Sequence, residues 1–154
     1  MGDRTQNWKG LEFVSAVPSQ MREAVEFLFF FNPGQALRLG GIRASIGHSG
    51  PPEILQRDGK LWIGVPSGAM QCLFACDTRC EPRRLAGVVL YVRVLPETLS
   101  ISHLAVHPEY AFGGDLGGGG LGLLLIEKVR EIARRINGVK KIQLPYKQGC
   151  FLPV

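Results

Sequence analysis

A run of glycines directly before an amphipathic segment is the feature of this sequence best suited to binding a charged ligand. Seven of the chain's 20 glycines fall within "GGDLGGGGLG", residues 113–122, and "LLLIEKV" follows at once. The first turn of a helix carries unpaired N–H groups and the positive end of the helix dipole. Glycines before such a turn let a phosphate approach the backbone closely. The pattern therefore predicts a cradle for a phosphate or pyrophosphate group.

Other interpretations of the glycine run fit less well. Gly117, Gly119 and Gly122 satisfy the G-x-G-x-x-G dinucleotide fingerprint. That fingerprint directly follows a strand and has an acidic residue about 20 residues later. Here roughly ten residues separate the preceding strand from the glycines, and the strand after the helix carries no acid. A P-loop lacks its Gly-Lys-Ser/Thr, and a linker would not lead into an amphipathic helix of the same domain.

The four cysteines do not form a metal-ligand pattern. Cys72, Cys76 and Cys80 are separated by three residues each, whereas paired zinc ligands usually have two between them. Cys72 and Cys76 fall on one face of a predicted strand, where cysteine behaves as a small hydrophobe. We therefore expect no metal.

Alternating helical and strand patterns predict the elements that hold the glycine run in place. A chain of 154 residues that is 45% hydrophobic suits a single domain, residues 1–154. A helix starting near Ser19 and a second, weaker one are followed by several strands, including the hairpin "AGVVLYVRVL" and "LSISHLAV". After the glycines come a helix and a last strand. The helix has one apolar stripe, formed by Leu125, Val129, Ile132 and Ile136. The expected elements are helices from Ser19 to a stop at Asn32–Gly34, over Gln35–Ile46 and over Leu121–Ile136, and strands at Leu61–Val65, Met70–Ala75, Ala86–Leu95, Leu99–Val106 and Lys140–Tyr146. This order predicts a mixed α/β domain.

The segment from Ser100 to Leu144 resembles the GNAT superfamily of acyl-CoA-dependent N-acyltransferases. "LAVHPEY" matches the end of the family's central strand, and Gly120 and Gly122 match the later positions of its pyrophosphate loop. Leu124 and Leu125 match the apolar residues that seat the following helix. The resemblance implies a mixed, largely antiparallel central sheet flanked by helices.

The resemblance also implies a binding site for acetyl-CoA or another acyl-CoA as co-substrate. Backbone groups of the central strand would hold pantetheine, and the glycine-loop amides with the helix start would hold the pyrophosphate. The acyl group would lie where this strand and the strand Ile142–Tyr146 separate. The implied co-substrate residues are Leu104, Ala105, Val106, Gly117, Gly118, Gly119, Gly120, Leu121 and Gly122.

The chemistry expected from the resemblance is direct attack of an amine on the thioester, with a base removing the amine proton. His103 is the candidate base, since imidazole titrates near neutral pH. It shares an expected strand face with Leu99, Ile101 and Ala105, which also suits a structural histidine. Tyr146 is the candidate acid for the leaving thiolate, or an ordinary strand tyrosine.

The expected partners are a small-molecule or peptide amine acceptor, and neither a membrane nor a nucleic acid. The net charge of +5 favours an anionic ligand, but Glu127 and Glu131 interrupt the basic residues of the last helix. Without an apolar leader or spanning segment, the expected location is the cytoplasm. A short C-terminus leaves a sheet edge open, which suggests a homodimer. A binding protein for acyl-CoA or another phosphorylated ligand without turnover is the alternative function.

Overall fold

The computed structural model describes residues 9–29, 52–110, 120–144 and 150–154. Within them, six strands form one sheet in the order β1-β5-β6-β7-β8-β9, and three form a smaller sheet in the order β2-β4-β3. Every pairing is antiparallel except β7–β8, which is parallel and connected through a helix. The predicted fold class is therefore confirmed: a mixed α/β arrangement with a largely antiparallel sheet.

The helices and strands lie close to the predicted positions. Their bounds are β1 Leu11–Val14, β2 Val17–Pro18, η2 Ser19–Met21, α1 Arg22–Phe29, β3 Glu53–Arg57, β4 Lys60–Gly64, β5 Met70–Asp77, β6 Arg84–Leu95, β7 Thr98–Val106, η4 Pro108–Tyr110, α3 Leu121–Arg134, β8 Lys141–Gln143 and β9 Phe151–Pro153. Strands β1, β2, β3 and β9 were not predicted, because they are short and expose much of their surface. The second predicted helix, Gln35–Ile46, lies outside the described residues.

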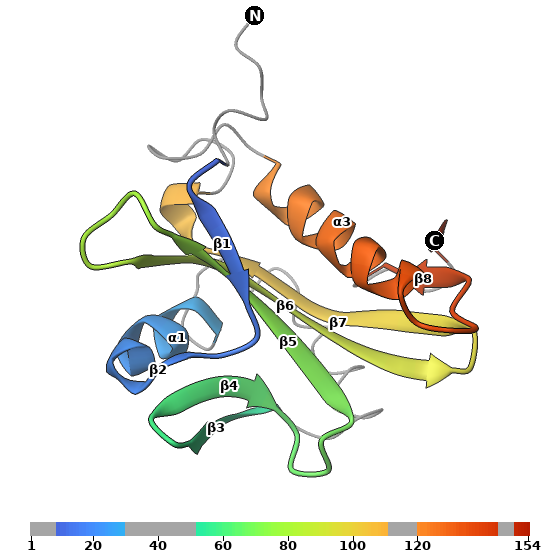
Figure 1. Ribbon diagram of the computed structural model, residues 1–154, viewed down its shortest axis with the longest axis horizontal. Coiled ribbons are helices and arrows are strands. Elements are labelled where there is room, and N and C mark those ends of the chain that lie inside the picture. The colour runs from blue at the N-terminus through green and yellow to red at the C-terminus, as the bar shows by residue number, and fades with distance from the viewer. Residues whose placement is uncertain (1–8, 30–51, 111–119, 145–149) are drawn as a thin grey trace, which may run out of the picture.

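Two hydrophobic cores lie on opposite faces of the main sheet. Figure 1 shows α3 running across one face and α1 on the other, with the smaller sheet on the α1 side. In β6, Val88 and Leu90 belong to the α1-side core, whereas Val89 belongs to the α3-side core. This is the period-two alternation predicted for a strand buried on both faces.

Helix α3 packs on the sheet through a stripe that differs from the predicted one. The predicted stripe joined Leu125 and Val129 to Ile132 and Ile136. In the structure Leu125 and Val129 are buried, but Ala133 continues the stripe. Residues four apart stay on one face of a helix, and the small Ala133 allows close packing at the end of α3.

Strand β9 covers the edge of the sheet that was expected to be open for a homodimer. It pairs with β8 through Lys141–Pro153 and Gln143–Phe151, so the outer side of β8 is covered by this chain's own residues. The outer strand of the sheet on this side is therefore β9. A homodimer stays a prediction.

Candidate functional site

The parallel strands β7 and β8 pair over a short distance only. Thr98, Leu99 and Ser100 pair with Lys141, Ile142 and Gln143, and the β7–β8 ladder of the described residues ends there. Strand β7 continues to Val106. The predicted pantetheine-binding residues Leu104, Ala105 and Val106 therefore lie on the part of β7 beyond this ladder.

A register shift in β7 separates the two halves of the strand. Leu90 of β6 pairs with His103, but the next residue, Tyr91, pairs with Ile101, so Ser102 is an extra residue. Such a bulge moves the residues on its two sides onto different faces of the sheet. It lies two residues beyond Ser100, the last described residue of β7 that pairs with β8.

This bulge corrects the predicted neighbours of His103. Leu99 and Ile101 belong to the α3-side core, whereas Ala105 belongs to the α1-side core. His103 lies on the α1 side, where its ring meets Phe29 edge-on at 5.3 Å between centroids. Strict alternation along β7 predicted one common face, and the extra residue breaks that alternation.

His103 is deeply buried, and burial lowers its pKa to about 4. The imidazole is therefore neutral at neutral pH, because protonation would place a charge in an apolar environment. A neutral imidazole has the protonation state of a proton acceptor, although its basicity is weak. The other predicted catalytic residue, Tyr146, lies outside the described residues.

Helix α3 begins with the backbone geometry expected of a glycine cradle. Gly120 is its N-cap with a left-handed φ of 93°, and no side chain caps the helix there. The N–H of Leu124 donates to the Gly120 carbonyl at 2.9 Å, which closes the first turn. No acidic residue lies in that turn to offset the helix dipole. Of the predicted loop residues, Gly117, Gly118 and Gly119 lie outside the described residues.

Two glycines bring the start of α3 close to the sheet. A Cβ on Gly122 would lie 3.4 Å from Leu104 Cδ2, so the first turn of α3 lies against β7. A Cβ on Gly87 of β6 would lie 3.1 Å from Leu125 Cδ1 and 3.1 Å from the Ala105 carbonyl oxygen. The two predicted arms of the co-substrate site, β7 and the α3 start, are therefore in contact.

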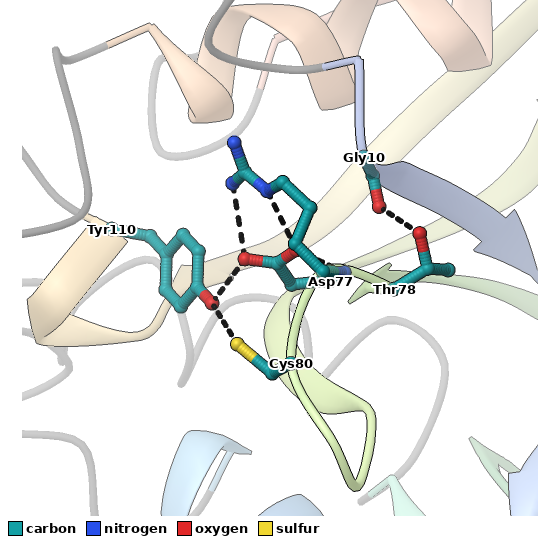
Figure 2. A network of polar contacts seen from close by, with 6 residues as sticks. Gly10, Asp77, Thr78, Cys80 and Tyr110 are labelled. Atoms are coloured by element: carbon teal, nitrogen blue, oxygen red, sulfur yellow. Dashed lines mark hydrogen bonds and ion pairs between the residues drawn. The ribbon is translucent and has the colours of Figure 1, made fainter.

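A buried polar network anchors the turn that follows β7 (Figure 2). The Tyr110 hydroxyl donates to Asp77 Oδ2 at 2.7 Å, and Arg79 donates to both oxygens of the same carboxylate at 2.9 and 3.0 Å. The Cys80 sulfur lies 4.0 Å from the Tyr110 hydroxyl. The arginine hydrogen bonds hold the pKa of Asp77 at about 2, so the carboxylate is charged. The sequence patterns did not predict this network.

No local signal in the sequence could have revealed the Asp77–Tyr110 pair. The two residues are 33 positions apart, and Asp77 stands in "DTRCEPRR", which has the composition of an ordinary polar turn. Only the antiparallel pairing of β5, β6 and β7 brings the end of β5 next to the end of β7.

The basic residues of α3 are paired with acids. Lys128 contacts Glu131 at 3.4 Å, and Glu127 contacts both Arg130 at 3.3 Å and Arg134 at 3.6 Å. Alternating charges on a helix face in this way are typical of a solvated surface. This pairing gives no support to nucleic-acid binding through α3.

Two other kinds of site are absent from the described part of the chain. No group of three or more His, Cys, Asp or Glu side chains there could hold a metal ion. None of the helices there has the length and apolar character needed to cross a bilayer.

Comparison with known proteins gives structural similarity only. No protein-family model matches the chain, and no curated protein matches its sequence. It is similar to the crystal structure of an acetyltransferase from Streptococcus agalactiae 2603, with a TM-score of 0.47 and 14% identity over 88% of this chain and 73% of that one. It is also similar to nourseothricin acetyltransferase, with a TM-score of 0.48 and 18% identity over 88% of this chain and 73% of that one.

The arrangement agrees with the fold class expected from the sequence, a mixed and largely antiparallel sheet with helices on its faces. It joins a largely antiparallel sheet to a β7–α3–β8 unit whose strands are parallel. At identities this low the two similar structures assign no role to any residue here.

Proposed function

We propose that this chain is an N-acyltransferase that transfers an acetyl or other acyl group from acyl-CoA to an amine. The observation that carries the proposal is the N-terminus of α3, which begins at the left-handed Gly120 and packs against Leu104 of β7. Among the described residues, no side chain caps this helix start and no carboxylate lies in its first turn, which favours an anion there.

In the proposed complex, the two arms of the site bind different parts of the co-substrate. Amides of the glycine run, from Gly117 to Gly122 with Leu121, would bind the pyrophosphate. The backbone of Leu104, Ala105 and Val106 would bind the pantetheine. Binding in this way would place the thioester toward the Ser102 register shift, where β7 leaves β8.

The proposed reaction is direct attack by the amine nitrogen on the thioester carbonyl carbon. A C–N bond forms and the C–S bond breaks, so the products are an amide and the free thiol of CoA. The amine loses one proton to a base, and the thiolate gains one from an acid. His103 is the proposed base and Tyr146 the proposed acid. The acceptor is proposed to be the amine of a small molecule or a peptide.

Ligand-induced stabilisation tests the binding part of the proposal. Acetyl-CoA at about 100 times its Kd should stabilise the fold by about 2.7 kcal/mol, measured as a rise in Tm. The site is tested by Gly120→Ala, which strains the left-handed position, and we expect weaker binding. If millimolar acetyl-CoA leaves the Tm unchanged, the proposal is overturned.

Gly59 supplies a matched control for Gly120→Ala. It too has a left-handed φ, of 76°, and a Cβ there would also meet nothing within 4 Å. Gly59 lies in the turn between β3 and β4, in the smaller sheet. Gly59→Ala should therefore have a similar backbone cost and leave acetyl-CoA binding unchanged. An equal loss of binding in both variants would point to general destabilisation.

Release of free thiol tests the catalytic part. Against a panel of amines, His103→Gln should lower kcat by about 100-fold to 10,000-fold if His103 is the base. The wild type should show an acidic limb in kcat/KM near pH 4, where His103 gains a proton, and the variant should lack it. Tyr146→Phe tests the acid in the same assay. Binding without thiol release for every amine would instead indicate a ligand-binding protein.

A further inference from the structure

Three contacts fasten the turn η4 to the hairpin end of β5 and β6. The His107 N–H donates to the Ala86 carbonyl oxygen at 2.8 Å. Glu109 forms an ion pair with Arg84, and the Tyr110 hydroxyl donates to Asp77 at 2.7 Å. The first two contacts involve backbone or partly exposed groups, whereas the Tyr110 side chain is fully buried. The Tyr110–Asp77 bond is therefore the contact that fixes a side chain inside the fold.

Tyr110 connects this polar anchor to the core beneath α3. Its ring belongs to the same buried cluster as Leu104 of β7 and Leu121 and Leu125 of α3. Leu121 is the first residue of α3 and follows Gly120 directly. The hydroxyl end of Tyr110 is held by Asp77, and its ring is part of the same buried cluster as the residues that seat the helix start.

The Asp77 carboxylate is itself held rigidly. It accepts hydrogen bonds from the backbone N–H and the guanidinium of Arg79, at distances from 2.9 to 3.0 Å. Figure 2 shows the Tyr110 hydroxyl pointing toward this carboxylate. A charged acceptor fixed by several donors forms short and directional hydrogen bonds. The fixed Asp77 carboxylate therefore holds the Tyr110 hydroxyl in one position.

We propose that Tyr110, through its hydrogen bond to Asp77, is a positioning residue that sets the place of the α3 N-terminus relative to β7 and so tunes phosphate binding. The inference rests on the proposed function, because the α3 start is the proposed phosphate site. It predicts a selective effect. Breaking the Tyr110–Asp77 hydrogen bond should weaken the binding of the CoA phosphates at the α3 N-terminus. The binding of pantetheine to β7 should stay unchanged.

Tyr110→Phe tests the proposal with the smallest change. It removes the hydroxyl and keeps the ring in the core, and Asp77 Oδ2 keeps its donor from Arg79 at 3.0 Å. Coenzyme A binding is measured by calorimetry and pantetheine binding by an NMR titration of the protein. We expect Kd for CoA to rise about threefold to thirtyfold, the range typical of residues that act through a neighbour. Kd for pantetheine, which has no phosphate, should stay the same.

Thr78→Val is the matched control in the same turn. It also removes one hydroxyl, which donates a hydrogen bond to the Gly10 carbonyl at 2.7 Å. That bond connects the turn to the residue before β1, and not to η4. The Thr78 backbone N–H keeps its own bond to Gly10 at 2.8 Å. This variant should bind CoA like the wild type. Glu109→Gln, which breaks the ion pair to Arg84, loosens η4 from its exposed side and should shift CoA binding in the same direction as Tyr110→Phe.

The outcomes separate this inference from the proposed function. A wild type that does not bind CoA overturns both. A wild type that binds CoA, with Tyr110→Phe and Glu109→Gln binding equally well, overturns the positioning role alone. An equal weakening for CoA and pantetheine indicates a general loosening of the fold and also overturns it. A loss confined to CoA, absent in Thr78→Val, supports it.

Discussion

Gly87 and Leu125 lie so close that a methyl group on Gly87 would come within 3.1 Å of Leu125 Cδ1. Gly87 is in the middle of the sheet, and Leu125 is one turn into α3. The same methyl group would also meet the Ala105 carbonyl oxygen of β7 at 3.1 Å. Because Gly87 of β6 has no side chain, α3 can lie close to β7, the strand proposed to bind the co-substrate.

Gly87→Ala should destabilise the protein by about 1–3 kcal/mol, because the added methyl group overpacks the core. Urea unfolding measures the effect. Gly64→Ala is the control, since a Cβ there has no neighbour nearer than 3.6 Å, and it should change stability by less than about 0.5 kcal/mol. Adding Leu125→Val should recover part of the loss, because it frees space at the contact. Similar free energies of unfolding for both alanine variants would contradict the close packing.

Acid should destabilise the protein through Asp77. The hydrogen bonds from Arg79 lower its pKa to about 2, whereas an unfolded aspartate titrates near 3.9. The stabilisation is complete above pH 5 and is lost as the pH falls to 2, amounting to about 2 kcal/mol. Chemical unfolding at pH 5 and at pH 2 should show this loss in the wild type and a smaller one in Asp77→Asn. Parallel curves for the two proteins would rule out this origin.

His103 should make the stability of the protein depend on pH in a higher range than Asp77 does. The unfolded chain protonates this histidine below about pH 6.5, whereas burial keeps the folded form neutral down to about pH 4. A proton taken up only by the unfolded chain favours unfolding. Stability should therefore fall by about 3 kcal/mol between pH 7 and pH 4. His103→Leu should show a much flatter profile over this range, and an unchanged profile would mean that the imidazole is accessible to protons in the native state.

The cysteines should differ in their reactivity. Cys72 and Cys76 are buried, and burial raises the pKa of both thiols to about 11, whereas Cys150 is exposed. Since the thiolate is the reactive form, iodoacetamide at pH 8 should modify Cys150 and spare Cys72 and Cys76. Peptide mass spectrometry identifies the modified sites, with urea-unfolded protein as the fully reactive control. Modification of Cys76 as fast as Cys150 would show that the core of β5 opens readily.

Local patterns in the sequence predicted the elements that carry the proposed site. The glycines before Leu121 and the apolar spacing after it are sufficient to predict a helix with an open N-terminus. The apolar and β-branched residues from Ala86 to Leu95 are sufficient to predict a strand. These predictions hold because helix starts and strand faces depend on residues only a few positions apart.

The position of His103 and the Asp77–Tyr110 bond were decided by tertiary structure. An extra residue at Ser102 moves His103 to the α1 face, and that bulge arises from the pairing of β6 with β7. Asp77 meets Tyr110 because three antiparallel strands bring distant turns together. Sequence alone thus determined the type of the longer elements, among them β6, β7 and α3. The three-dimensional packing decided which side chains meet, because such contacts depend on strand register and on the distance between layers.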